Sequence, residues 1–186
     1  KRAAKALHFV WMYSVASILI YSPIVAWIVY FERPQFETLH WVALFATGVL
    51  HLCYSLILQA GYRASDLSLV YPLARGSGPL LSFLGAALLL GEHVTWLSML
   101  GCALVVVGIV LVAGLFLEAH KAPKIGIAYG LATGVFIAAY TLNDGWAVKA
   151  LLISPFIVDY TGNVFRVCVL SPGAWREVRN RPHSEC

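Results

Sequence analysis

The residue with the clearest chemical role in this sequence is an arginine inside an apolar run. Arg75 would place a full charge in hydrocarbon, which costs about 2.5–3.5 kcal/mol on insertion scales, so we expect it to face a bundle interior or a wet cavity. There it would bind an anionic group or a counter-carboxylate, with Tyr71, one helical turn earlier, as a hydrogen-bonding neighbour. The alternative is a structural arginine that bonds backbone carbonyl groups freed by nearby prolines. The residues that loosen this helix, and that we expect to form a flexible element, are Pro72, Pro79, Gly76 and Gly78.

A second polar group lies near the end of the apolar run Ile125–Ala147. Tyr140, Asn143 and Asp144 have the spacing i, i+3 and i+4, which places their side chains on one face of a helix. We expect Asp144 to be a partner for Arg75 or for a cationic substrate. The alternative is an interfacial carboxylate close to the helix end.

A third polar face follows in the run Ile153–Ser171. Asp159 and Arg166 are seven residues apart, about 10 Å along a helix, so they need a group between them to interact closely. Asn163 lies between them on the same face. This arrangement predicts the lining of a cavity; the alternative is a segment that lies at the membrane surface.

A single intramembrane histidine, His51, is a candidate proton relay. The alternative is a packed, hydrogen-bonded histidine without a role in transport. The sequence contains no nucleophile elbow, Walker loop, HExxH motif or pair of catalytic carboxylates at fixed spacing. We therefore predict no enzyme activity, no catalytic residue, no bound metal and no cofactor.

The composition identifies the class of protein. Of the 186 residues, 60% are hydrophobic and only 12% are charged, whereas soluble domains carry roughly 25% charged residues. The chain is predicted to be an all-α polytopic membrane protein with about six transmembrane helices of about 20 residues each. Its net charge of +4 comes from residues in short segments beside apolar runs, which indicates contact with lipid rather than nucleic acid. The runs are Leu7–Phe31, His40–Gly61, Leu67–Leu90, Val94–Leu117, Ile125–Ala147 and Ile153–Ser171.

Short connections between these runs predict antiparallel neighbours in one compact bundle. Glycines at a spacing of four residues mark a helix face that can approach another helix closely, because lipid supplies no hydrophobic force between helices. We interpret these glycines as packing residues rather than substrate contacts. They are Gly126, Gly130 and Gly134.

Two segments resemble a known family. The run DLSLVYPLARGSGPLLSFLGAALLLGEHVTWLSMLGCALVVVGIVLVAG is similar to the EamA-like domain of the drug/metabolite transporter superfamily. The points of similarity are a proline-bearing helix with small residues, Gly91 and Glu92 at its end, and a following helix with spaced glycines. The segment GIAYGLATGVFIAAYTLNDGWAVK resembles the opening helix of such a domain.

The resemblance implies a larger architecture. Carriers of this family have about ten helices in two five-helix repeats of inverted topology, with the binding cavity between the repeats. Residues 1–118 would then form the first repeat without its first helix, and residues 119–186 would begin a second, truncated repeat. Lys and Arg residues favour a cytoplasmic N-terminus by the positive-inside rule, whereas the family topology would place Lys1 outside, so the orientation stays open.

The resemblance also implies a function. We expect a secondary carrier or exporter of a small metabolite, such as an amino acid, an amine or a phosphonate-like anion, that works by alternating access. The expected location is the bacterial inner membrane, and the expected partners are the substrate and the lipid bilayer; a homodimer is left open. The alternative is a membrane accessory or scaffold subunit without transport activity.

Overall fold

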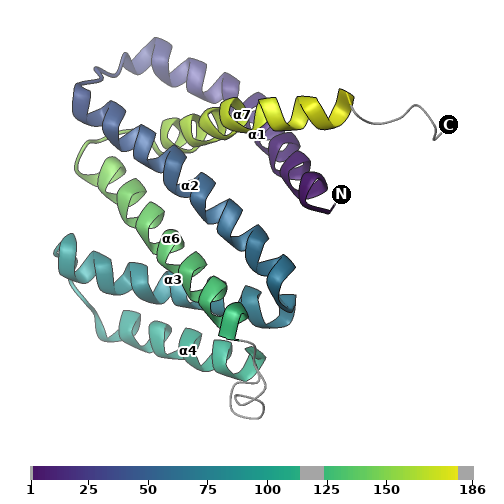
Figure 1. The fold of residues 1–186 in the computed structure, drawn as a ribbon. Coiled ribbons are helices and arrows are strands. Elements are labelled where there is room, and N and C mark those ends of the chain that lie inside the picture. Colours follow the sequence, from purple (N-terminus) through teal and green to yellow (C-terminus); the bar gives the residue numbers. More distant parts are fainter. Residues whose placement is uncertain (1, 114–123, 180–186) are drawn as a thin grey trace. The chain divides into compact units, whose positions relative to one another are not determined.

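The computed structural model describes residues 2–113 and 124–179, and within these ranges the chain forms six α-helices and no strand (Figure 1). Each predicted apolar run coincides with one of these helices, so the all-α prediction is confirmed. The part of the fourth run after residue 113 lies outside the described residues. The helices are α1 (Arg2–Glu32), α2 (Thr38–Ala64), α3 (Leu67–Leu89), α4 (Trp96–Ala113), α6 (Lys124–Lys149) and α7 (Pro155–Arg179).

Three helices in the described part of the chain are long and apolar enough to cross a membrane. They are α2, α6 and residues Phe9–Glu32 of α1, while α4 contributes a shorter apolar stretch, Trp96–Leu111. The other two helices have sufficient length, at 23 residues for α3 and 25 for α7. Their interiors carry polar residues that the sequence analysis assigned to a transport path.

The connection between α3 and α4 shows why α3 ends and α4 begins at these residues. Gly91 adopts φ 65°, a left-handed conformation that glycine enters at little cost, and the N–H of Glu92 bonds back to the carbonyl of Ala86. At the start of α4, Thr95 and Ser98 cap each other reciprocally, because each backbone N–H donates to the other residue's hydroxyl oxygen. This turn is part of the segment that carries the family resemblance.

The chain divides into two compact units, residues 50–146 and residues 1–49 with 147–186. In the first of these, α3 packs against α4, and glycines bring α3 and α6 into close contact (Figure 1). A Cβ atom added at Gly130 would lie 2.7 Å from the Cβ of Leu73, and one added at Gly78 would lie 2.5 Å from Cγ2 of Ile137. The backbones therefore approach as closely as glycine allows.

The contacts between α3 and α6 follow a nearly constant register. The two helices run in the same direction, and three of the contacting pairs are separated by 57 sequence positions, while Gly78 and Ile137 are separated by 59. The three pairs are Leu73 with Gly130, Ser77 with Gly134, and Gly85 with Leu142.

The other unit contains α1, the first part of α2 and α7. The indole Nε1 of Trp11 on α1 donates to the hydroxyl of Ser171 on α7 at 3.0 Å. On α2, the ring of Phe45 meets that of Phe165 edge to face at 5.4 Å, and Gly48 leaves room for the same Phe165 side chain. Thus α7 contacts both α1 and α2 within this unit.

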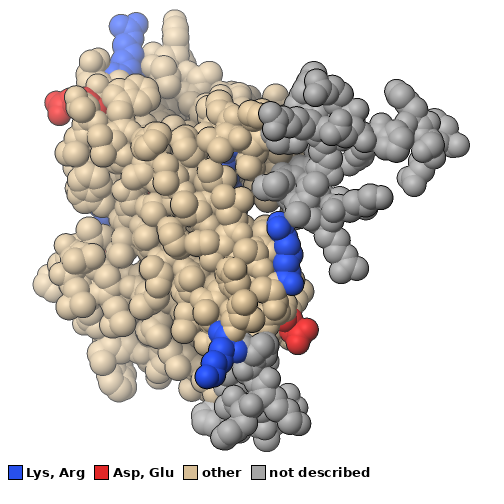
Figure 2. Space-filling view, in the orientation of Figure 1, with Lys and Arg blue, Asp and Glu red and all other residues tan. Residues whose placement is uncertain are grey.

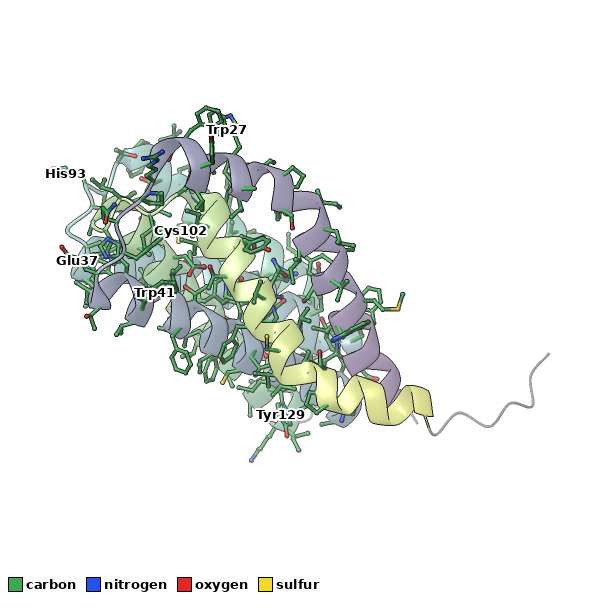
Figure 3. The ribbon with its side chains drawn as sticks, turned by 90° about the horizontal axis from the view of Figure 1, so that it is seen from above. Trp27, Glu37, Trp41, His93, Cys102 and Tyr129 are labelled. Atoms are coloured by element: carbon green, nitrogen blue, oxygen red, sulfur yellow. The ribbon has the colours of Figure 1, made fainter. Side chains whose placement is uncertain are left out.

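The surface is strongly apolar. Figure 2 shows a face on which almost all described side chains are neither acidic nor basic. Trp27 is 57% exposed and points away from the neighbouring helices (Figure 3), and Leu104 on α4 is 63% exposed. Exposed apolar side chains on this scale mark a surface that contacts lipid or other protein rather than water.

The close contact between α3 and α6 predicts a position-dependent effect of alanine. Gly130→Ala places a methyl group against Leu73, so we expect the free energy of unfolding to fall by about 1–3 kcal/mol. Gly145→Ala on the same helix is the matched control, because its Cβ meets nothing within 4 Å and alanine favours the helix by about 0.8–1 kcal/mol. Unfolding in detergent micelles would measure both. Equal effects of the two changes would contradict the packing described here.

Candidate functional site

Polar side chains from three helices gather in the unit formed by residues 50–146. This cluster, called the polar site below, combines aromatic rings with one acidic and two basic groups. Two of the helices are predicted membrane spans, and the third contains the intramembrane arginine. Its members are His51 and Tyr54 on α2, Tyr71 and Arg75 on α3, and Tyr140 and Asp144 on α6.

The centre of the polar site is a histidine–aspartate pair. His51 Nε2 lies 3.2 Å from Asp144 Oδ2, and the two side chains are 16% and 26% exposed. When Nε2 carries a proton, it donates a hydrogen bond to the carboxylate. The carbonyl oxygen of His51 also accepts a hydrogen bond from the hydroxyl of Ser55 at 2.8 Å. The pair thus joins α2 to α6 through a hydrogen bond between two ionisable groups.

Aromatic rings cover the histidine. The Tyr140 ring lies 4.0 Å from the His51 ring between centroids, at an angle of 47°, and Tyr54 meets Tyr140 edge to face at 5.6 Å. Tyr140 precedes Asp144 by one helical turn, so α6 presents a ring and a carboxylate to the same histidine. Such a ring face also favours a cation beside it.

Arg75 lies apart from this pair. Its side chain is exposed, and its guanidinium carbon is 5.6 Å from the centroid of the Tyr71 ring, which is cation–π distance. Among the side chains that the structure describes, no carboxylate lies within ion-pair distance of Arg75. Its charge nevertheless acts on the hydroxyl groups of Tyr62 and Tyr140.

The register of α3 and α6 explains why Arg75 and Asp144 do not pair. Arg75 is level with Ala132 on α6, and Asp144 lies twelve residues further along, about 18 Å at 1.5 Å per residue. Asp144 therefore contacts His51 instead of its predicted partner, Arg75. Asn143, the neighbour of Asp144, is half-buried on α6.

The prolines around Arg75 do not interrupt the helix. α3 continues from Leu67 to Leu89 through Pro72 and Pro79. Because Pro79 has no N–H, the carbonyl of Arg75 lacks its usual intrahelical donor. Gly76 packs against Ile109 of α4, and Gly78 packs against α6. The role of this segment as a flexible element stays a prediction.

The three residues predicted on α7 lie in the other unit. Asn163 is fully buried and donates through Nδ2 to the Asp159 carboxylate at 3.0 Å and to its carbonyl at 2.9 Å. Asn163 Oδ1 is buried and accepts no hydrogen bond from the described residues. Arg166 is 7% exposed, and its Nε donates to the carbonyl of Gly162 at 3.4 Å. Asn163 thus bonds Asp159 on the helix face that the sequence predicts, and its Oδ1 does not reach Arg166. The role of this face as the lining of a cavity stays a prediction.

Two tyrosines in this region were not among the predicted site residues. Tyr54 contacts Tyr140, and Tyr62 lies within electrostatic reach of Arg75. Tyr54 follows His51 by three residues, so helical spacing alone would have placed both on one face. No comparable signal in the sequence relates Tyr62 to Arg75, because they lie on different helices.

Comparison with known proteins gives one match. The model of the EamA-like transporter family matches residues 1–114, which include His51, Tyr54, Tyr71 and Arg75 but precede α6 and α7. No curated protein and no solved structure gave a significant match to the chain.

The contact between His51 and Asp144 predicts an energetic coupling between them. His51→Phe keeps a ring against Tyr140 and removes the ring nitrogens, and Asp144→Leu removes the carboxylate at similar volume. We expect a coupling free energy of about 0.5–3 kcal/mol in a double-mutant cycle of unfolding in micelles. His51→Phe combined with Asp66→Leu is the control cycle, since Asp66 is exposed and its side chain makes no capping hydrogen bond. Additive effects in the first cycle would mean that the hydrogen bond contributes nothing.

Proposed function

Because the chain belongs to the EamA-like transporter family, whose model matches residues 1–114, we propose that it is a secondary carrier for a small metabolite with an anionic group. Family membership and the apolar helices indicate an integral membrane transporter rather than an enzyme. A carboxylate or phosphonate group is the proposed point of recognition. The proposed location is the bacterial inner membrane.

The observation that carries this proposal is the set of contacts made by the Arg75 side chain. Its guanidinium rests beside the Tyr71 ring and has no ion-pair partner among the described side chains. A guanidinium presents donors in a planar fork that matches carboxylate and phosphonate oxygens in a bidentate manner. Because an uncompensated charge in a membrane protein is costly, an anionic ligand would stabilise Arg75 as well as being held by it.

The rest of the proposed path comes from the other polar residues. Tyr71, Tyr62 and Tyr140 offer hydroxyl groups within the electrostatic reach of Arg75 or one another. The α7 residues Asp159, Asn163 and Arg166 would line a further part of the path.

Transport itself would follow the architecture of the family. In this proposal residues 1–118 belong to a first repeat and residues 119–186 open a second one. Alternating access would rock one repeat against the other around the bound substrate. The segment between Pro72 and Pro79, where α3 lacks two backbone donors, would take up part of the change.

Three phenyl compounds that carry different charged groups test the proposal. Proteoliposomes of the full-length protein would be assayed for uptake of phenylphosphonate, phenylalanine and phenyltrimethylammonium. We expect uptake of the first two. Arg75→Ala should reduce it about ten-fold or more, because a charge-assisted hydrogen bond contributes about 1.5–3 kcal/mol.

The control for this experiment is Arg63→Ala. Arg63 is an exposed arginine in the last turn of α2, so its removal changes the net charge equally without touching the polar site. Unchanged uptake of phenylphosphonate and phenylalanine in Arg75→Ala would remove Arg75 from the mechanism. Selective uptake of phenyltrimethylammonium alone would replace the anion by a cation as substrate, and failure to transport any of the three would favour an accessory role.

A further inference from the structure

Substrate recognition at Arg75 makes no use of the pair formed by His51 and Asp144. Both groups are ionisable, lie within hydrogen-bond distance and are mostly shielded from solvent. Histidine is the side chain that ordinarily changes its charge between pH 5 and 8. A proton added to this pair converts a neutral imidazole beside a carboxylate into an imidazolium–carboxylate pair, which changes the net charge from −1 to zero.

Aromatic and titratable groups surround the pair. On α6, the centroid of the Tyr140 ring lies 4.0 Å from that of the imidazole, with an angle of 47° between the ring planes. On α2, the titratable neighbours are Tyr54 and, further along, Tyr62. Low solvent access strengthens the attraction between imidazolium and carboxylate compared with a pair in water.

The third helix at the site, α3, contributes Tyr71 and Arg75, and no titratable residue follows Arg75 before the helix ends at Leu89. From the register with α6, the backbone positions of Arg75 and Asp144 are about 18 Å apart along the helix axis. Among the described residues no ion pair joins Arg75 to Asp144, although both charges act on the hydroxyl of Tyr140.

We propose that the His51–Asp144 pair is the binding site for a proton whose movement across the membrane is coupled to transport of the anion held by Arg75. The proposal rests on the proposed function for its substrate site. The proton enters the pair from water on one side of the membrane and forms an N–H bond on the imidazole. That bond breaks when the proton is released to water on the other side.

Proteoliposomes of the full-length protein can separate coupling from transport. The membrane potential is held at zero, phenylphosphonate is the probe, and an internal pH-sensitive dye reports protons. Exchange of labelled for unlabelled phenylphosphonate needs no net proton movement, whereas accumulation against a gradient driven by a pH difference does. In the unmodified protein we expect both, with a change in the internal pH during uptake.

Variants of the pair should lose the driven component. In His51→Phe and Asp144→Asn we expect accumulation to fall to the level seen without a pH difference, and any remaining exchange to be independent of that difference. Asp144→Glu keeps the carboxyl group and should restore part of the accumulation. The control variants are His93→Phe and Asp66→Asn, which alter an exposed histidine and an exposed aspartate.

The outcomes distinguish this proposal from the proposed function. Accumulation that survives in both pair variants overturns the proposal, because the probe's own protonation would then supply the drive. Exchange without accumulation in the unmodified protein also overturns it and leaves the carrier function intact. Loss of exchange in every pair variant, including Asp144→Glu, would assign the pair to substrate binding instead. Absence of exchange in the unmodified protein would reject the carrier function and this proposal with it.

Discussion

The register between α3 and α6 is the constraint on which the polar site depends. Glycines at the contact let the two backbones approach, and close approach permits only a small set of relative positions because neighbouring side chains must interdigitate. That register places the backbone of Arg75 level with Ala132, and the described side chains form no ion pair between Arg75 and Asp144. Asp144 is then available to His51 of α2, which brings a ring and a second ionisable group. The packing of the helices therefore determines which polar side chains of the site meet.

The lipid environment accounts for features that would be unfavourable in a soluble domain. In lipid the burial of apolar surface does not drive helices together, so exposed leucine, phenylalanine and tryptophan side chains carry no cost there. Backbone groups must instead be satisfied within each helix. Side-chain hydroxyls bond carbonyls one turn earlier in α3 and α6, as Ser77 does with Leu73 and Thr133 with Tyr129. α3 remains helical although two of its positions lack a donor.

The helices were predictable because the length of an apolar run is set by the thickness of the bilayer and is visible in one sequence. Contacts within a helix were predictable for a similar reason: Asn163 bonds Asp159 at the expected spacing of four residues. Contacts between helices were not predictable from the sequence. Helical spacing states which residues share a face, but the relative shift of two helices depends on how their small residues meet. For that reason Asp144 was expected beside Arg75 and is found beside His51.

Charge gives a physical reason for coupling in the proposed carrier. Arg75 without an anion is a single positive charge, and the His51–Asp144 pair without a proton carries a single negative charge. Each of these charges is costly to move through low-dielectric surroundings. An anion neutralises the first and a proton neutralises the second. Occupation of either place therefore changes the free-energy cost of the conformational change. Through that shared cost the proton and the anion would be coupled without any direct contact between them.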